Sequence, residues 1–237
     1  MIKMENDSLI SHLIELRSRL IRILVVFLGV FIIGIPFAND IYPIFADPLI
    51  RLLPENSSMI ATQVSSPFMV PIKLVASLSI FLTIPYLFYQ IWLFIVPGLY
   101  KNEKAFLRPL FISTAILFYS GVVFAYLVVM PVIFNFFINI APSSIQIMTD
   151  INSYLGFVLK MLFGFGIAFE VPVATFLVIT TGLITIEKIT AARPFLIISF
   201  FVIAMILTPP DIFSQLFLAI PMWILFEIGI ILAKLKG

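Results

Sequence analysis

Long apolar runs separated by short polar segments dominate the pattern of this 237-residue chain. Several runs reach or approach the roughly 20 residues that a helix needs to cross a bilayer. Six candidate transmembrane helices can be drawn, at about 21–38, 72–96, 109–138, 154–181, 195–207 and 212–233. The pattern therefore predicts an all-α integral membrane protein, with six spans in a single polytopic domain that covers residues 1–237.

Proline, glycine and polar residues mark the expected ends and bends of these spans. The markers are Pro36 with Asn39 and Asp40 after span one, Pro85 inside span two, Pro97 and Gly98 after it, Pro109 at the start of span three, a kink at Pro131, and Gly182 after span four. A proline fixes φ and removes a backbone donor, so it favours helix starts and bends over helix interiors. For the same reason the proline-rich segment Asn39–Pro71 is expected to be a stiff, turn-rich loop.

The last two spans are expected to be short. Residues Phe195–Leu207 rise only about 20 Å as a helix, against a hydrocarbon core of about 30 Å. The segment TPPD then forces a turn, and Pro221 interrupts the sixth span. Local bilayer thinning or cover from neighbouring helices would accommodate this hairpin, and a buried re-entrant hairpin is the alternative.

Composition agrees with a membrane protein. The chain is 62% hydrophobic and 11% charged, whereas soluble domains carry about 25% charged residues. It has no cysteine, which excludes disulfides and thiolate metal sites. The polar, mixed-charge first residues do not resemble a cleavable signal peptide, so the first apolar run is expected to be an uncleaved span.

Positive charge predicts the orientation. With six spans, eleven of the fourteen Lys and Arg residues fall on one side of the membrane, and the opposite loops hold only Arg51, with Lys73 at a span edge and Lys160 inside span four. Because cytoplasmic loops are enriched in Lys and Arg, both termini are expected to be cytoplasmic.

The side chains that most enzymes need are missing from the apolar segments. His12 is the single histidine and lies in the N-terminal segment, while Asp211 lies at the turn between the last two spans. No HExxH motif, serine–histidine pairing, metal-ligand cluster or phosphate-binding loop is recognisable. The sequence therefore predicts a protein that is not an enzyme, without metal or other cofactor, and no nucleic acid is expected among its partners.

Two glutamates lie on the basic side. Residues 12–22 form an amphipathic pattern in which Glu15 and Arg19, four apart, could pair on one face, and Glu103 lies between Lys101 and Lys104. An interfacial helix with self-paired charges and a solvated loop glutamate are the simpler interpretations. However, a cationic ligand could dock on so basic a face only at carboxylates, and a guanidinium suits them because it binds bidentately.

Glu170 lies about 18 Å from the end of span four, close to mid-membrane. A charge there costs roughly 2.5–3.5 kcal/mol on insertion scales. Lys160 lies about 15 Å away along the axis on a different face, so it does not obviously neutralise the carboxylate. Two interpretations remain: a protonated acid hydrogen-bonded between helices, or a carboxyl group facing a wetted groove, which the nearby Pro172 favours.

Polar residues also gather at the last hairpin. Asp211 could cap the start of the sixth span directly after the TPP turn. Gln215, in a short span with Thr208 nearby, could instead hydrogen-bond a partner helix.

Five motifs in these segments resemble the TatC family, the C subunit of the twin-arginine protein translocase. They are HLIELRSRL and PGLYKNEK on the basic side, FEVP in span four, and LTPPDIFSQ followed by AIP at the last hairpin. They extend over nearly the whole chain in the expected order, which makes the set specific although no single motif is.

The resemblance implies a receptor for twin-arginine signal peptides and a core subunit that exports folded precursor proteins, driven by the protonmotive force without a nucleotide. It implies a curved, glove-like bundle in the bacterial cytoplasmic (inner) membrane. The implied partners are the single-span TatA and TatB subunits, other TatC copies and membrane lipid.

The resemblance also implies roles for particular residues. Glu15 and Glu103 would hold the twin arginines, with Arg17 and Phe94 in the same signal-peptide site, and Glu170 would keep a polar spot at membrane depth. Pro48 and Asp211 match loop positions that the family treats as functionally important, and Met205, Thr208 and Gln215 match its partner-helix contact. An ion- or proton-coupled small-solute transporter that uses Glu170 and Lys160 is the alternative function.

Overall fold

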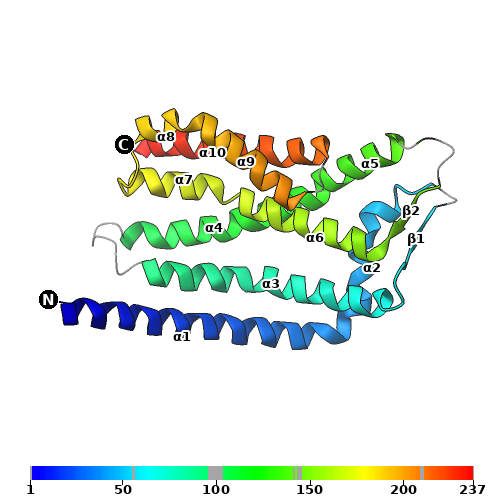
Figure 1. The fold of residues 1–237 in the computed structure, drawn as a ribbon, viewed down its shortest axis with the longest axis horizontal. Helices are drawn as coiled ribbons and strands as arrows, with labels where there is room; N and C mark the ends of the chain where they lie inside the picture. Colours follow the sequence, from blue (N-terminus) through cyan, green and yellow to red (C-terminus); the bar gives the residue numbers. More distant parts are fainter. Residues whose placement is uncertain are drawn as a thin grey trace. The chain divides into compact units, whose positions relative to one another are not determined.

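The computed structural model describes residues 2–54, 57–95, 104–140, 142, 146–208 and 211–236, with the backbone alone for 2–13, 92, 94–95, 104–111 and 236. Helices dominate these ranges (Figure 1). The elements are α1 (Ile2–Gly34), a 3₁₀ turn (Ile35–Phe37), α2 (Ala38–Ile50), β1 (Ser58–Ile60), α3 (Ser66–Ile95), α4 (Lys104–Phe124), a π-helical turn (Ala125–Val129), α5 (Met130–Ile140), β2 (Met148–Asp150), α6 (Ile151–Ala168), α7 (Val171–Thr180), α8 (Ile186–Ala191), α9 (Arg193–Leu207) and α10 (Ile212–Lys236).

The chain divides into two compact units. The first comprises residues 1–42 and 71–115, and the second comprises residues 43–70 and 116–237. The single polytopic domain and the glove-like bundle therefore stay predictions, and each unit is described by itself.

Five helical segments in the described part of the chain are long and apolar enough to cross a membrane. They are Ile14–Ile50, Ser66–Ile91, Ile112–Ile140, Ile151–Thr180 and Ile212–Leu235. Each overlaps one of the predicted spans, which confirms a mostly helical, multi-pass pattern, while six full spans and the orientation of the termini stay predictions.

The last two helices differ from each other in length. α9 has 15 residues and so rises about 22 Å, which agrees with the short fifth span expected from the sequence. The expectation of a short sixth span is wrong. α10 runs through Pro221 without a break for 25 residues, about 37 Å, because the proline costs one backbone hydrogen bond that the rest of the helix outweighs.

The first span and the amphipathic N-terminal segment form one helix, α1, which ends in a 3₁₀ turn containing Pro36. The segment after it is more helical than predicted. α2 begins at Ala38 and contains both Pro43 and Pro48, so a turn-rich loop is wrong for this first part.

The third span also begins earlier than predicted. α4 starts at Lys104, so Pro109 does not lie in its first turn. The irregularity expected near Pro131 is present as the π-helical turn Ala125–Val129. A wider turn suits this position, because Pro131 cannot donate the backbone hydrogen bond to Leu127.

In the first unit, α1 lies alongside α3 (Figure 1). The helices approach closely at Gly34, where an added Cβ would lie 2.8 Å from Cγ1 of Val75. Lipid tails are as apolar as leucine, so packing at small residues, rather than escape from water, stabilises such helix pairs.

In the second unit, α10 packs along α7 and α9. Its buried side chains recur every three or four residues, which places them on one face: Leu218, Met222, Phe226, Ile230 and Ala233. Gly229 lies on this same face, and an added Cβ there would lie 2.9 Å from the carbonyl oxygen of Pro172 on α7.

A short parallel pairing of β1 with β2, from Ser58↔Met148 to Ile60↔Asp150, is the one departure from helix among the described elements. Asp150, the last residue of β2, stabilises the end of this strand pair. Its carboxylate accepts hydrogen bonds from the Thr62 hydroxyl (2.7 Å), the Thr62 N–H (3.1 Å) and the Ser153 N–H (2.9 Å). These bonds, the Thr62 hydroxyl first, hold the pKa of the Asp150 carboxyl well below its usual range.

Candidate functional site

The predicted pair on α1 is present. Arg19 donates from Nε to Oε1 of Glu15 at 3.0 Å and from Nη2 to the same oxygen. The side chain of Glu15 is 38% exposed, whereas that of Arg19 is only 14% exposed. The carboxylate proposed to receive a ligand guanidinium therefore already holds one from its own helix.

Arg19 also reaches the C-terminal part of α3. Nη1 donates to Oε1 of Gln90 at 3.0 Å and to its backbone oxygen at 3.4 Å, and Nη2 donates to the backbone oxygen of Leu93 at 3.3 Å. α3 ends at Ile95, where carbonyl groups lack helical partners and carry a negative partial charge. The hydrogen bonds of Arg19 therefore hold the Glu15 side chain beside the end of α3.

The sequence analysis missed Gln90. An amide inside a long apolar run was the available signal, and the structure leaves it only 3% exposed. Its fully buried position requires a polar partner, and Arg19 supplies one.

The other residues predicted for this site are only partly described. Arg17 is exposed on α1, two residues from Glu15. Phe94 lies in the last turn of α3, and its side chain is outside the described part. Glu103 lies outside the described residues, directly before α4. An approach of Glu103 to Glu15 therefore stays a prediction.

Glu170 lies at a break in the fourth span. α6 ends at Ala168 and α7 begins at Val171, with Pro172 in its first turn. The Glu170 N–H donates to the Ile167 carbonyl at 2.9 Å, a tight turn that separates the two helices. The sequence predicted one continuous helix here, so the break is a feature it missed, and the half-buried Glu170 lies at this break. The wetted groove that Pro172 was expected to favour stays a prediction.

A second carboxylate in an apolar span was missed. Glu227 in α10 accepts a hydrogen bond at 2.7 Å from Nη2 of Arg193, the first residue of α9. Glu227 is the one acidic residue in the apolar run after Asp211, and this isolation was the available signal. The ion pair holds the start of α9 against α10.

The residues predicted at the last hairpin do not share one exposed face. Asp211 accepts a hydrogen bond from the Ser214 N–H at 2.7 Å, which confirms it as the cap of α10. Met205 is 54% exposed, Gln215 is half-buried, and Thr208 is buried with its hydroxyl donating to the Ala204 carbonyl. Met205 is therefore the most accessible of the three predicted partner contacts.

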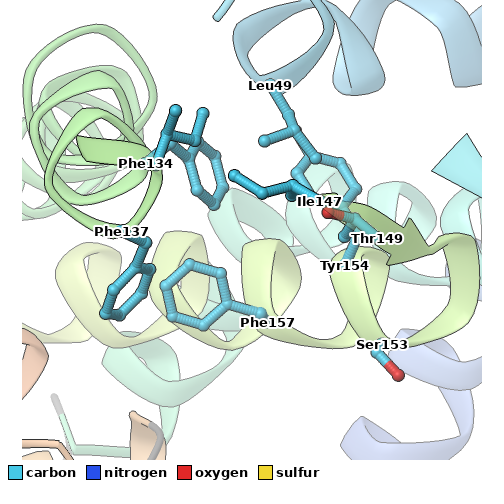
Figure 2. Close-up of a pocket in the computed structure, with 9 residues that line it drawn as sticks. Leu49, Phe134, Phe137, Ile147, Thr149, Ser153, Tyr154 and Phe157 are labelled. Atoms are coloured by element: carbon cyan, nitrogen blue, oxygen red, sulfur yellow. The ribbon is translucent and has the colours of Figure 1, made fainter. Parts of the chain in front are cut away.

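Pro48 lies in α2, half-buried and next to the ion pair of Asp47 with Arg51. The second unit also has an apolar pocket of about 300 Å³ where α2, α5 and the start of α6 come together (Figure 2). Leu49, Phe134, Phe137 and Phe157 supply much of its apolar wall. Its lining contains no charged side chain among the described residues.

No group of three or more His, Cys, Asp and Glu side chains within the described ranges could hold a metal ion. The polar groups that are present suit another chemistry. They are carboxylates paired with guanidinium groups, at Glu15, Asp47 and Glu227.

Comparison with known proteins decides the family. The model of the family described as Sec-independent protein translocase protein (TatC) matches residues 11–221. The chain belongs to the TatC family. It is 49% identical to the TatC of Haemophilus influenzae, over 97% of this chain and 90% of that protein, and 47% identical to the TatC of Escherichia coli K12, over 97% and 89%.

The fold agrees with this assignment. A crystal structure described as the twin arginine translocase receptor TatC is 35% identical, with a TM-score of 0.85 over 94% of this chain and 98% of that one. The predicted resemblance is confirmed, and the chain is a multi-pass membrane protein of a protein translocase family. This family favours protein translocation over the alternative of small-solute transport.

Proposed function

We propose that the chain is the signal-peptide receptor and core subunit of a twin-arginine translocase, which exports folded precursor proteins. The observation that carries the proposal is the likeness over 94% of the chain to a TatC structure described as the translocase receptor. The half-exposed Glu15 carboxylate, already bound to a guanidinium in the structure, supports arginine as the recognised side chain.

In this proposal Glu15 and Glu103 each receive one of two consecutive arginines. A guanidinium forms two parallel hydrogen bonds with a carboxylate, whereas a lysine ammonium acts as a point charge, so paired carboxylates discriminate between them. Arg17 and Phe94 flank the same site, Arg17 exposed on α1 and Phe94 at the end of α3.

The proposed setting is the bacterial cytoplasmic (inner) membrane, crossed six times with both termini in the cytoplasm. The distribution of eleven Lys and Arg residues on one side supports this orientation. Export is driven by the protonmotive force.

The proposed partners are TatA, TatB and further TatC copies, in contact with α9 and α10 through Met205, Thr208 and Gln215. The exposure of Met205 supports its place in this contact. Glu170, at the break of the fourth span, accommodates an inserted peptide or a polar group of a partner. Pro48, inside α2, and Asp211, the cap of α10, are two further functional positions in this proposal.

Binding of a labelled twin-arginine signal peptide to the detergent-purified chain tests the receptor function. Glu15→Ala and Glu103→Ala are each expected to weaken binding at least tenfold, about 1.4 kcal/mol. Glu187→Ala removes an exposed carboxylate in the first turn of α8, so it is the matched control and should bind like the unmodified chain. Equal binding of a twin-lysine peptide, unaffected by either substitution, would refute the proposal.

A further inference from the structure

Arg19 contacts the proposed peptide-binding carboxylate in an asymmetric way. Both of its hydrogen bonds to Glu15 go to the same oxygen, Oε1. Oε2 of Glu15 accepts no hydrogen bond within the part of the chain whose side chains are described, and the side chain is 38% exposed. A carboxylate oxygen has two acceptor positions, so Oε2 has room for an incoming N–H group.

We infer that Arg19 is a positioning residue, which fixes the Glu15 carboxylate beside the end of α3 and leaves Oε2 to a ligand guanidinium. The inference rests on the proposed peptide-binding function and adds to it the group that sets the geometry of the site. Arg19 does not touch the ligand in this arrangement. It acts through Glu15.

The contacts of Arg19 decide between positioning and competition. All three guanidinium nitrogens are engaged: Nε and Nη2 with Glu15, Nη1 with Gln90, and Nη2 also with the Leu93 carbonyl. Removing this 14% exposed group would break several charge-assisted bonds and leave the buried Gln90 amide without this partner. A ligand arginine meets less resistance at Oε2 than in displacing Arg19.

The two helices joined by Arg19 also explain why a guanidinium is needed. Gln90 and Leu93 lie on α3, and α3 leads into the segment that contains Glu103. A planar fork with five donors reaches acceptors on α1 and α3 at once, whereas an ammonium presents three donors from a single atom. Arg19 thereby joins α1, which carries Glu15, to the end of α3, eight residues before Glu103 in the sequence.

The test uses the full chain in detergent and a labelled peptide with two consecutive arginines before a hydrophobic segment, compared with its twin-lysine counterpart. Arg19→Lys keeps the charge and removes the fork. It is expected to raise the Kd of the arginine peptide about tenfold and to lower the preference for arginine over lysine to a similar extent. Gln90→Ala should act in the same direction, about threefold, because Arg19 loses one of its anchors.

Arg22→Lys, on the exposed face of the same helix, is the matched control and should change neither quantity. The thermal midpoint of each variant shows whether the fold is kept, and Gln90→Ala carries the test if Arg19→Lys does not fold. Selectivity is the deciding readout, since a merely structural weakening would lower the affinity for both peptides alike.

Unchanged selectivity in both variants would overturn the inference, as would tighter arginine binding, which would make Arg19 a competitor of the ligand. If the unmodified chain binds both peptides equally, the proposed function and this inference fail together. If Glu15→Ala abolishes selective binding while Arg19→Lys and Gln90→Ala do not affect it, the positioning role alone fails.

Discussion

Gly121 and Phe165 bring the backbones of α4 and α6 into direct contact. A Cβ added at Gly121 would lie 2.4 Å from the Phe165 carbonyl oxygen and 2.9 Å from its carbonyl carbon. These neighbours are backbone atoms, which cannot rotate away as a side chain can. The two helices can approach this closely because residue 121 has no side chain.

Gly121→Ala is therefore expected to destabilise the second unit by about 2 kcal/mol or more, within the range for overpacked sites. Gly156→Ala is the matched control, because an added Cβ there meets nothing within 4 Å. The control should be neutral or stabilise α6 by about 0.5–1 kcal/mol. Thermal unfolding in detergent compares them, and equal midpoints for the two variants would contradict the close approach.

The ion pair of Arg193 with Glu227 predicts a coupling between α9 and α10. The two side chains are partly buried, with 38% of Arg193 and 26% of Glu227 exposed. The contribution of this ion pair to stability should therefore lie between that of a surface pair and that of a buried pair. Each single substitution, Arg193→Gln or Glu227→Gln, is expected to lower the free energy of unfolding by about 1–2 kcal/mol.

A double-mutant cycle measures this coupling. The double variant should be less destabilised than the sum of the single variants, since the second substitution removes a partner that is already unpaired. Strict additivity would show that the pair contributes nothing. Arg51→Gln in the more exposed pair with Asp47 is the control and should have little effect.

The cap of α10 gives a prediction that separates two roles of Asp211. If its side chain acts as the cap seen in the structure, Asp211→Asn keeps an acceptor for the Ser214 N–H and stays near the stability of the unmodified chain. Asp211→Ala should lower the free energy of unfolding by about 1 kcal/mol, because the Ser214 N–H loses its acceptor. Loss of protein export in Asp211→Asn without loss of stability would instead show a role for the charge itself.

Asp150 predicts a pH dependence. Its pKa in the folded chain lies below its usual value, so the ionised carboxylate stabilises the link to Thr62 above about pH 4. As the pH falls below that value, the unfolded chain takes up a proton before the folded chain does, and this stabilisation is lost.

The comparison of the unmodified chain with Asp150→Asn tests this. The difference between their thermal midpoints should be constant from pH 7 to about pH 5 and should shrink below about pH 4. Hydrogen exchange of the Thr62 and Ser153 amides follows the same bonds directly. A difference that is independent of pH, or that grows on acidification, would contradict the assignment.

Patterns local in the sequence predicted local features well. The ranges of the apolar runs, the short α9, the pairing of Glu15 with Arg19 four residues on and the cap at Asp211 each depend on neighbours along one helix. Helix geometry and proline chemistry fix such features before any tertiary contact forms. The errors were also local and came from proline, at α2 and α10, where helical hydrogen bonds outweighed the one that each proline removes.

The sequence by itself determined that this chain is a helical, multi-pass membrane protein with carboxylates at defined places, and its ordered motifs identified the family. Only the tertiary structure decided which distant groups meet: Arg19 with Gln90 across 71 residues, Arg193 with Glu227 across 34, and Asp150 with Thr62 across 88. Such pairs carry no periodicity, because their partners lie on different elements. They are set by how apolar surfaces and small residues let helices pack, and polar groups then pair where packing has placed them.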